Sequence, residues 1–209
     1  MRLLYGTYNP AKLAVMRRWL HELDLELVGL FELENLPDDV EETGSTPLEN
    51  ARIKAIAYQR ATGMDVLSAD SGLYINGLPE DQQPREHARR IAGKRLDDDE
   101  MIAHYAKLVH AQGGRMVAQY RNALCIAFAD GQIIDRFDDS VSSKKFYLVD
   151  TPHEKRTNGF PLDSLSVDII SGEYYYDLHS VRADDDLAQE TGYCRFVREA
   201  LAAHDHKSL

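Results

Sequence analysis

The sequence predicts a mixed α/β fold, because short apolar runs of strand length alternate with segments whose apolar residues recur at helical spacing. The chain opens with such a pair: Leu3–Tyr5 is strand-like, and Pro10 then begins a segment of helical spacing. Further on, Asp130-Gly131 separates two long β-like segments, and Asp-Gly accepts the positive φ values of a tight turn. Together these observations indicate helices combined with a sheet that contains a hairpin.

One helix in the first third of the chain has the clearest boundaries. Thr46 is a hydroxyl residue suited to a helix N-cap, Pro47 follows at a tolerated first-turn position, and Glu49 stands three residues after the cap. Apolar residues continue on one face until Gly63, which favours a helix end. The sequence therefore predicts a helix between Thr46 and Gly63.

The remaining elements follow from the same kinds of spacing. In chain order, they are a strand at 3–5, a helix from Pro10 to Leu23, a strand at 25–30, an acidic loop at 36–42, strands at 66–69 and 73–75 on either side of an Asp70-Ser71-Gly72 loop, two helical stretches between 85 and 111, hairpin strands at 116–129 and 133–141, strand and loop at 144–177, and a final helix capped by Asp184-Asp185-Asp186 and running towards Leu201. We find no internal repeat or linker, so residues 1–209 are expected to form a single domain.

The composition excludes several classes of protein. A formal net charge of −11 argues against binding of a nucleic acid polymer, since such binding neutralises phosphates with many Lys and Arg side chains. Cys125 and Cys194 form no CxxC pair, so neither a disulfide framework nor a zinc knuckle is indicated. The first residues lack the apolar core of a signal peptide, and no window approaches a membrane span. We therefore expect a cytoplasmic protein that has a small ligand and no membrane partner.

Candidate ligand-binding residues lie at three junctions between strand and helix, since no P-loop and no GxGxxG occurs. The first junction contains Thr7, Asn9 and Lys12, where a strand end leads into a helix. The free N–H groups and the positive dipole end of such a helix favour an anion. Taken alone, the segment is more typical of an ordinary capped turn.

The second and third junctions add carboxylates. Glu49 and Lys54 lie five residues apart and project from neighbouring parts of one helix surface, although Glu49 alone is better explained by capping the Thr46 N–H. Asp70 stands at a strand end beside the small hydroxyl of Ser71, where a turn is an equally good explanation. Together the junctions contain two lysines, two carboxylates and a helix N-terminus, which magnesium-assisted hydrolysis of a phosphoanhydride requires.

The order and spacing of these segments resemble the inosine triphosphate pyrophosphatase family, also known as Ham1-like. The family pattern T-x-N-x-x-K appears at residues 7–12, and the very specific pattern E-T-G-x-T-x-x-E-N-A-x-x-K-A appears at residues 42–55. The pattern A-D-D-S-G-L appears at residues 68–73 with Ala69 in place of the first aspartate, and S-A-R-Y-A-G is echoed at residues 87–93.

The resemblance implies an elongated α/β fold with two lobes and a nucleotide cleft between them, a homodimer, and Mg²⁺ as the cofactor. It also carries residue roles over by position. The implied roles are triphosphate binding for Thr7, Asn9 and Lys12, substrate contact for Ser71, neutralisation of phosphate charge for Lys54, Mg²⁺ binding for Glu49 and Asp70, and, for Asp70, acceptance of the proton of the attacking water.

The base-reading segments of the family are less complete. The pattern G-F-G-[YW]-D-P appears at residues 159–164, which keep Phe160 and Asp163 for substrate binding but lose the second glycine and the aromatic residue. The K-N-x-x-S-H-R pattern is reduced to Arg195. The tyrosines at 174–176 could stack on a base instead, although an aromatic strand packed on the core is the commoner explanation. Selectivity for inosine is therefore not assumed.

The sequence thus predicts a Mg²⁺-dependent nucleoside triphosphate pyrophosphatase that removes nucleotides outside the standard set. Asp70, Lys12 and Lys54 would be its catalytic residues. Two alternatives stay open because the base-reading segments are incomplete. One is a nucleotide-binding regulatory protein on the same scaffold without turnover, and the other is a hydrolase for a different modified nucleotide.

Overall fold

The computed structural model describes residues 1–35, 38–91, 93–178 and 181–206. Residues 36–37 of the predicted acidic loop and residue 92 of the segment 87–93 lie outside the described residues. In chain order the elements are β1 (Arg2–Tyr5), α1 (Pro10–Trp19), β2 (Glu26–Gly29), η1 (Leu30–Glu32), α2 (Pro47–Thr62), β3 (Val66–Ile75), η2 (Glu80–Gln82), β4 (Arg90–Ile91), β5 (Lys94–Arg95), α3 (Asp98–Ala111), β6 (Arg115–Ala127), β7 (Ile133–Arg136), β8 (Phe146–Val149), η3 (Pro161–Leu165), β9 (Ser166–Val167) and α4 (Val181–Asp205).

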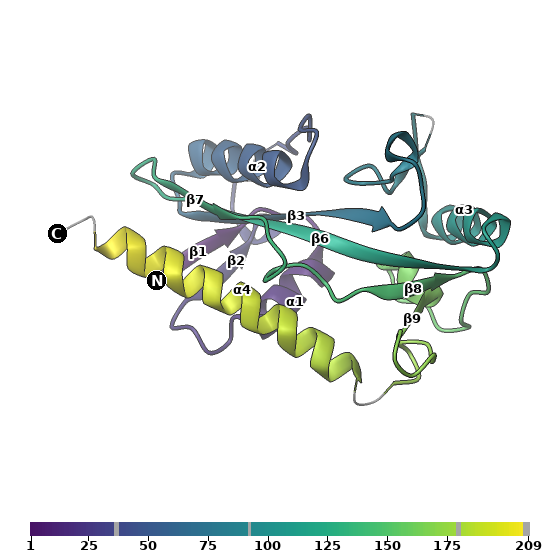
Figure 1. The fold of residues 1–209 in the computed structure, drawn as a ribbon. Helices are drawn as coiled ribbons and strands as arrows, with labels where there is room; N and C mark the ends of the chain where they lie inside the picture. The colour runs from purple at the N-terminus through teal and green to yellow at the C-terminus, as the bar shows by residue number, and fades with distance from the viewer. Residues whose placement is uncertain (36–37, 92, 179–180, 207–209) are drawn as a thin grey trace. The chain divides into compact units, whose positions relative to one another are not determined.

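The mixed α/β class is confirmed, since the helices accompany a seven-stranded sheet with both parallel and antiparallel pairs (Figure 1). The strand order is β2-β1-β3-β6-β8-β9, and β7 pairs with β6. β1 is parallel to β2 and to β3, whereas β6 is antiparallel to β7 and to β8. The parallel strands are those that helices connect, and the antiparallel pair β6–β7 is the predicted hairpin.

The chain divides into two compact units. Unit 1 contains Met1–Ser71, Arg121–Ser142 and Ala188–Leu209, and unit 2 contains Gly72–Tyr120 and Ser143–Leu187. The strands β3 and β6 each contribute residues to both units. That residues 1–209 form a single domain stays a prediction.

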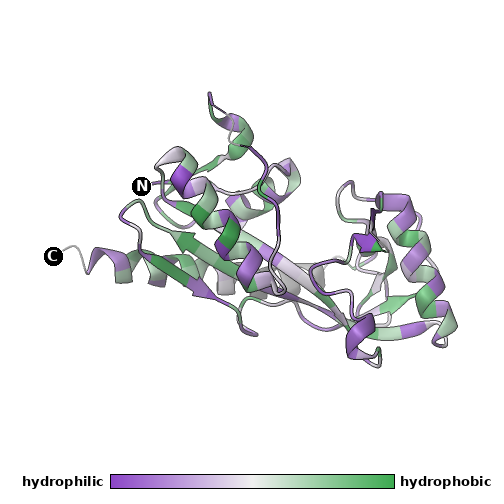
Figure 2. Cartoon of the chain, turned by 90° about the horizontal axis from the view of Figure 1, so that it is seen from above, coloured by the Kyte–Doolittle hydropathy of each residue, from purple (hydrophilic) through white to green (hydrophobic). Residues whose placement is uncertain are grey.

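Alternation along the strands of unit 1 places apolar side chains on both faces of its sheet. Leu3 and Tyr5 of β1 belong to a core with α1 and α4, whereas Leu4 between them belongs to a core with Tyr58 of α2. Figure 1 shows α2 on one side of these strands and α1 and α4 on the other. Figure 2 shows the strands as mostly hydrophobic and the helices as mixed, as expected for helices that bury one face.

Both helix starts predicted for unit 1 are confirmed. α1 begins at Pro10, and α2 begins after Thr46, whose Oγ1 accepts from Glu49 N at 3.2 Å. α2 ends at Thr62, and its C-cap is Gly63, which has the left-handed φ of 70° that glycine adopts without strain. α1 ends at Trp19, before the predicted Leu23, and a turn follows at residues 20–22.

The described residues of unit 2 form one apolar core, to which α3 contributes. Tyr105 and Val109 of α3 are fully buried in it, together with Leu162 and Leu165 of η3. The core is completed by residues of β3, β6 and β8. η3 is therefore held against α3 by apolar side chains, and this contact positions the segment that precedes η3.

The first of the two helices predicted between residues 85 and 111 is wrong, because a two-stranded hairpin of β4 and β5 stands there instead. Arg85 has a φ of 47°, and its backbone N–H and C=O pair with Leu73 at 2.8 and 2.9 Å. These bonds hold the segment in an extended pairing that excludes a helix. Gly93, with a φ of 81°, allows the turn between β4 and β5. The second predicted helix is confirmed as α3.

Two further boundaries differ from the prediction. The expected loop Asp70-Ser71-Gly72 lies inside the continuous strand β3, and Gly72 is buried there without a positive φ. The final helix begins at Val181, so Asp184-Asp185-Asp186 lies within α4 and does not precede it. Asp, Ser and Gly are common in turns and helix caps, but they are also compatible with a strand or a helix. Tertiary packing decides which structure they adopt.

The hairpin is confirmed, with a shorter second strand than predicted. Gly131 has a φ of 90°, and Asp130 Oδ1 accepts from Gln132 N at 2.8 Å in the turn between β6 and β7. β7 ends at Arg136, because Asp138 then accepts from Ser140 N at 2.9 Å and turns the chain.

Cys125 and Cys194 are free thiols, and both are buried in unit 1. None of the helices in the described ranges is both long and apolar enough to cross a membrane.

Candidate functional site

Lys54 of α2 is the centre of a buried group of charged side chains in unit 1. Its Nζ donates to Glu42 Oε1 at 2.6 Å, to Asp70 Oδ1 at 3.1 Å and to the carbonyl oxygen of Ala69 at 3.1 Å. The side chains of Lys54 and Asp70 are each only 11% exposed. Three acceptors match the three donors of an ammonium group, so the buried lysine is satisfied. We call Glu42, Asn50, Lys54 and Asp70 the Lys54 cluster.

Asn50 connects Asp70 to the loop that precedes α2. Its Nδ2 donates to Asp70 Oδ2 at 3.3 Å, and its Oδ1 accepts from Gly44 N at 2.8 Å. Position 44 requires glycine, because an added Cβ would lie 2.6 Å from Glu49 Cβ and 2.9 Å from Asn50 N. The loop that carries Glu42 can therefore pack against the first turn of α2.

Neither Glu42 nor Asn50 is among the residues predicted for the site. Both lie inside the specific pattern at residues 42–55, so their place in that pattern was the available signal. In sequence alone, Glu42 is one carboxylate of an acidic loop, and Asn50 is one polar residue of a helix. Only the packing of that loop on α2 distinguishes them from their neighbours.

Burial and the neighbouring charges act in opposite directions on the two central groups. Burial raises the pKa of Asp70, Lys54 lowers it and Glu42 raises it, and the net result is a pKa above the usual range. Burial lowers the pKa of Lys54, but the charges of Asp70 and Glu42 outweigh it and the pKa is raised. Lys54 therefore stays a cation between two acids.

Glu49 is exposed at the start of α2, and its carboxylate is turned towards Ser45. Its Oε2 accepts from Ser45 N at 2.7 Å and from Ser45 Oγ at 2.8 Å, which lowers its pKa. The sequence favours a capping bond from the Thr46 N–H to Glu49. In the structure the donor is instead the N–H of Ser45, one residue earlier. Glu49 and Asp70 are nevertheless linked, because the residue after Glu49 is the Asn50 that donates to Asp70.

Thr7, Asn9 and Lys12 lie where β1 leads into α1, as predicted. Asn9 Oδ1 accepts from Ala11 N at 2.9 Å and from Lys12 N at 3.4 Å, and Thr7 Oγ1 accepts from Asn9 N at 3.2 Å. These side chains cap the helix, so its first N–H groups are already occupied. The charge of the exposed Lys12 acts to lower the pKa of Asp70. Lys12 of the first junction and Asp70 of the third therefore lie within electrostatic reach of each other. Ser71 is exposed beside Asp70 on β3.

The residues predicted to read the base belong to other elements. Phe160 and Asp163 lie in unit 2, where Phe160 is the N-cap of η3 and both are partly buried. Arg195 is exposed on α4 in unit 1. The tyrosines at 174–176 do not form the expected strand. Tyr175 packs on the core of unit 2. The rings of Tyr174 and Tyr176 each contact the ring of His153, with centroid distances of 5.1 and 5.4 Å.

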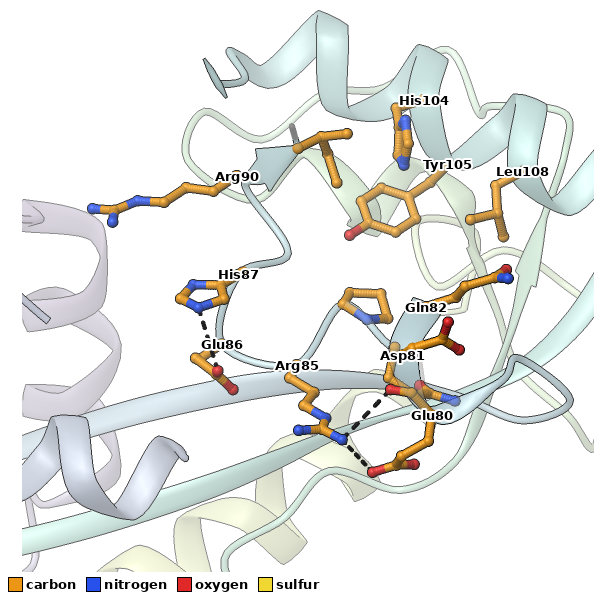
Figure 3. Close-up of a pocket in the computed structure, with 13 residues that line it drawn as sticks. Glu80, Asp81, Gln82, Arg85, Glu86, His87, Arg90, His104, Tyr105 and Leu108 are labelled. Atoms are coloured by element: carbon orange, nitrogen blue, oxygen red, sulfur yellow. Dashed lines mark hydrogen bonds and ion pairs between the residues drawn. The ribbon is translucent and has the colours of Figure 1, made fainter. Parts of the chain in front are cut away.

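Unit 2 also contains a pocket of about 610 Å³ between the loop after η2 and α3 (Figure 3). Tyr105 and His104 of α3 line one side, and Glu86 and His87 line the loop side. Glu86 Oε1 lies 3.5 Å from His87 Nε2, whereas its buried Oε2 accepts no hydrogen bond from any described residue. None of the residues predicted for the site lines this pocket.

The residues of the Lys54 cluster and Glu49 fit a hard divalent cation in their chemistry. Mg²⁺ is typically held by one or two carboxylates together with substrate phosphates, and it keeps several waters. Asp70, Glu42 and Glu49 provide carboxylate oxygens, and two of these acids share the single cation Lys54. In the parts of the chain that the structure describes, no group of three His, Cys, Asp or Glu side chains forms a ready cation cage. The donor set therefore suits a metal that arrives with a phosphorylated ligand.

The fold and the site define an α/β protein with a buried acid and lysine pair beside a capped helix start. The Ham1 family model matches residues 3–165, and the chain belongs to the Ham1 family. A dITP/XTP pyrophosphatase from Rhodopseudomonas palustris is 35% identical over 136 residues. That match spans 63% of this chain and 63% of the relative, which is less than two thirds of its length.

Two solved structures resemble the whole chain. A nucleoside-triphosphatase, or dITP/XTP pyrophosphatase, from Mycobacterium abscessus superposes with a TM-score of 0.67 at 26% identity, covering 97% of this chain and 98% of the other. A Ham1 protein from Coxiella burnetii superposes with a TM-score of 0.74 at 24% identity, covering 97% and 99%. The second likeness shows the fold alone, and it extends beyond residue 165, where the family model ends.

Proposed function

We propose that this protein is a Mg²⁺-dependent pyrophosphatase that converts nucleoside triphosphates to monophosphate and pyrophosphate. The observation that carries the proposal is the buried Asp70 carboxylate, which Lys54 and Asn50 hold from two sides within the pattern shared with the Ham1 family. A carboxylate with fixed neighbours and a raised pKa is suited to accept a proton from water.

In the proposed reaction, water attacks the α-phosphorus while Asp70 accepts its proton. The bond between the α-phosphorus and the bridging oxygen to the β-phosphorus breaks, and that oxygen leaves with pyrophosphate. Mg²⁺, bound by Asp70 and a second carboxylate, would neutralise phosphate charge. Lys12 is exposed at the start of α1, where we propose that it neutralises charge on the departing phosphates, whereas Lys54 holds Asp70 in place and adds positive charge beside it.

Two acids compete for the role of second metal ligand. Glu49 is the residue that the sequence predicts, but its Oε2 is bound to Ser45. Glu42 shares the Lys54 ammonium with Asp70, at 2.6 and 3.1 Å, so its carboxylate is anchored to the same group. These contacts favour Glu42, and the two choices are separated by experiment below.

The remaining predicted residues receive substrate-binding roles. Thr7 and Asn9 form the turn at the start of α1, where the helix dipole favours phosphate even though Asn9 caps the first N–H groups. Ser71 follows Asp70 on β3 and is exposed, and we assign it a contact with the substrate. Three residues from other elements are proposed to contact the base, namely Phe160, Asp163 and Arg195.

The substrate is proposed to be a purine nucleotide outside the standard set, since relatives are named for dITP and XTP. We keep the second candidate, a nucleotide-binding protein without turnover, because Arg195 alone remains of the family's last base-reading pattern. A hydrolase for a different modified nucleotide is the third.

A panel of standard and modified nucleoside triphosphates tests these candidates. Each is incubated with the protein and Mg²⁺, and pyrophosphate and orthophosphate are measured separately. The proposal expects pyrophosphate, with dITP or XTP among the best substrates. Tight binding of one nucleotide without hydrolysis of any would favour the regulatory protein, and preference for a modified pyrimidine would favour the third candidate.

We also propose a cytoplasmic homodimer, as the family resemblance implies. Two-fold symmetric pairs are the commonest soluble oligomers. Light scattering at micromolar concentration tests the dimer, and a strictly monomeric mass would count against it.

A further inference from the structure

The carboxylate of Asp98 joins two segments of unit 2 that are distant in sequence. Its Oδ1 accepts from Arg89 NH1 at 2.7 Å, and its Oδ2 accepts from the backbone N–H of Gly159 at 2.9 Å. Both oxygens therefore have a donor, and one donor is a guanidinium. Charge-assisted bonds of this kind are stronger than neutral ones.

Asp98 is not needed to start its helix. Asp97 is the N-cap of α3: its Oδ1 accepts from Glu100 N at 2.8 Å, and Glu100 Oε2 accepts from Asp97 N at 3.1 Å. This reciprocal pair caps the helix without any contribution from the side chain of Asp98. The two oxygens of Asp98 are instead directed at Arg89 and Gly159.

Gly159 immediately precedes Phe160, so its position determines where the aromatic side chain starts. Gly159 has a φ of 82°, a left-handed conformation that other residues rarely adopt. Phe160 N donates to Thr157 O at 3.0 Å, and Asp163 N donates to Phe160 O at 3.2 Å. After Phe160 the chain is fixed by the buried Leu162 and Leu165 of η3, whereas before it the Asp98 bond holds the backbone.

We propose that Arg89 and Asp98 are positioning residues that hold the Gly159–Phe160 turn so that Phe160 and Asp163 meet the nucleobase. The inference rests on the proposed function, because it assumes that these two residues face a nucleotide. Asp98 touches no substrate in this role and acts through Gly159. We call the contacts of Asp98 with Arg89 and Gly159 the brace. Loss of the brace should weaken the binding of a nucleotide and leave the binding of its phosphate part unchanged.

The experiment compares Asp98→Asn with Asp97→Asn, a matched change one residue away that removes the charge of the α3 N-cap and leaves the Gly159 contact in place. Calorimetry measures the affinity of each protein for dITP, in the presence of Ca²⁺ to slow turnover, and for inorganic pyrophosphate, which has no base. Hydrogen exchange measures the protection of the Gly159 amide.

For Asp98→Asn we expect about tenfold weaker binding of dITP, the scale of one lost charge-assisted hydrogen bond, with pyrophosphate affinity unchanged. The Gly159 amide should exchange faster than in the wild type. Asp97→Asn should change neither the affinity ratio nor this amide. Arg89→Met should act in the same direction as Asp98→Asn, and the two together should not be additive.

Equal weakening of dITP and pyrophosphate by Asp98→Asn would overturn the inference, as would an unchanged exchange rate at Gly159. A wild-type protein that binds no nucleotide in the full panel would instead overturn the proposed function, and the role assigned to the brace would fall with it. The exchange rate at Gly159 would then report only whether the contact holds the turn. The two failures are thus distinguishable.

Discussion

The Lys54 ammonium lies 3.1 Å from one carboxylate oxygen of Asp70, and it binds Glu42 at 2.6 Å from another direction. One buried cation is thus shared by two acids that come from different elements, the strand β3 and the loop before α2. Such an arrangement fixes both acids in place and provides carboxylate oxygens of the kind that a divalent cation prefers.

The change Asp70→Asn should reduce pyrophosphate release by about a thousandfold or more, because an amide has neither the negative charge nor the proton acceptor. The rate is measured on the best substrate of the panel, and circular dichroism verifies the fold. Asp65→Asn is the matched control, since Asp65 precedes the same strand and accepts from Ala129 N at 2.7 Å. A folded Asp70→Asn protein with wild-type rates would remove Asp70 from the mechanism.

The change Lys54→Met should destabilise the protein by about 3 kcal/mol, because it leaves Glu42 and Asp70 without their shared cation. Asp70→Asn should cost less, since Lys54 keeps Glu42 and the Ala69 carbonyl. The free energy of unfolding is measured with urea, and Lys107→Met at an exposed site of α3 is the control. Equal stability of the two lysine variants would show that the cluster does not hold unit 1 together.

Glu42→Gln should raise the Mg²⁺ concentration for half-maximal activity by about tenfold or more, and by more than Glu49→Gln does. The reason is that Glu42 is held beside Asp70 by Lys54, whereas Glu49 is bound to Ser45. The measurement is a Mg²⁺ titration of pyrophosphate release. A larger rise in this Mg²⁺ concentration for Glu49→Gln than for Glu42→Gln would restore Glu49 as the second ligand. If neither variant changes it, Asp70 would be the sole protein ligand of the metal.

The stabilisation by Asp98 should depend on pH. Burial opposes its charged form, but the bonds from Arg89 and Gly159 outweigh burial, and its pKa is lowered in the folded protein. A lowered pKa stabilises the fold above the ordinary value of about 3.9, and this stabilisation is lost as the pH falls through the folded value. The difference in unfolding free energy between the wild type and Asp98→Asn should therefore shrink below about pH 4. A constant difference would contradict the assignment.

Much of the fold could be predicted where local chemistry and tertiary packing agree. Thr46 and Gly63 bound α2 as expected, because a hydroxyl cap and a left-handed glycine act locally. The helix expected near Arg85 fails because pairing with Leu73 is a long-range contact that apolar spacing cannot reveal. The loop expected at Asp70 fails for the same reason, since β3 is paired on both sides.

The site shows the same division. Asp70 and Lys54 could be predicted from their spacing within the shared patterns, and the structure brings them together. Glu42 is the first residue of the specific pattern at residues 42–55, but the pattern does not show that this carboxylate meets a buried lysine. Its role depends on Gly44, which lets the loop approach α2 closely enough for Asn50 to bind both the loop and Asp70.

The position of the attacked phosphorus tests the proposed reaction most directly. Hydrolysis of dITP by the wild-type protein in ¹⁸O-labelled water, followed by mass spectrometry of both products, shows which phosphorus accepts the oxygen of water. We expect the label in the monophosphate and none in pyrophosphate, because water that loses its proton to Asp70 attacks the α-phosphorus. Label in pyrophosphate, or release of orthophosphate instead, would contradict the proposed function.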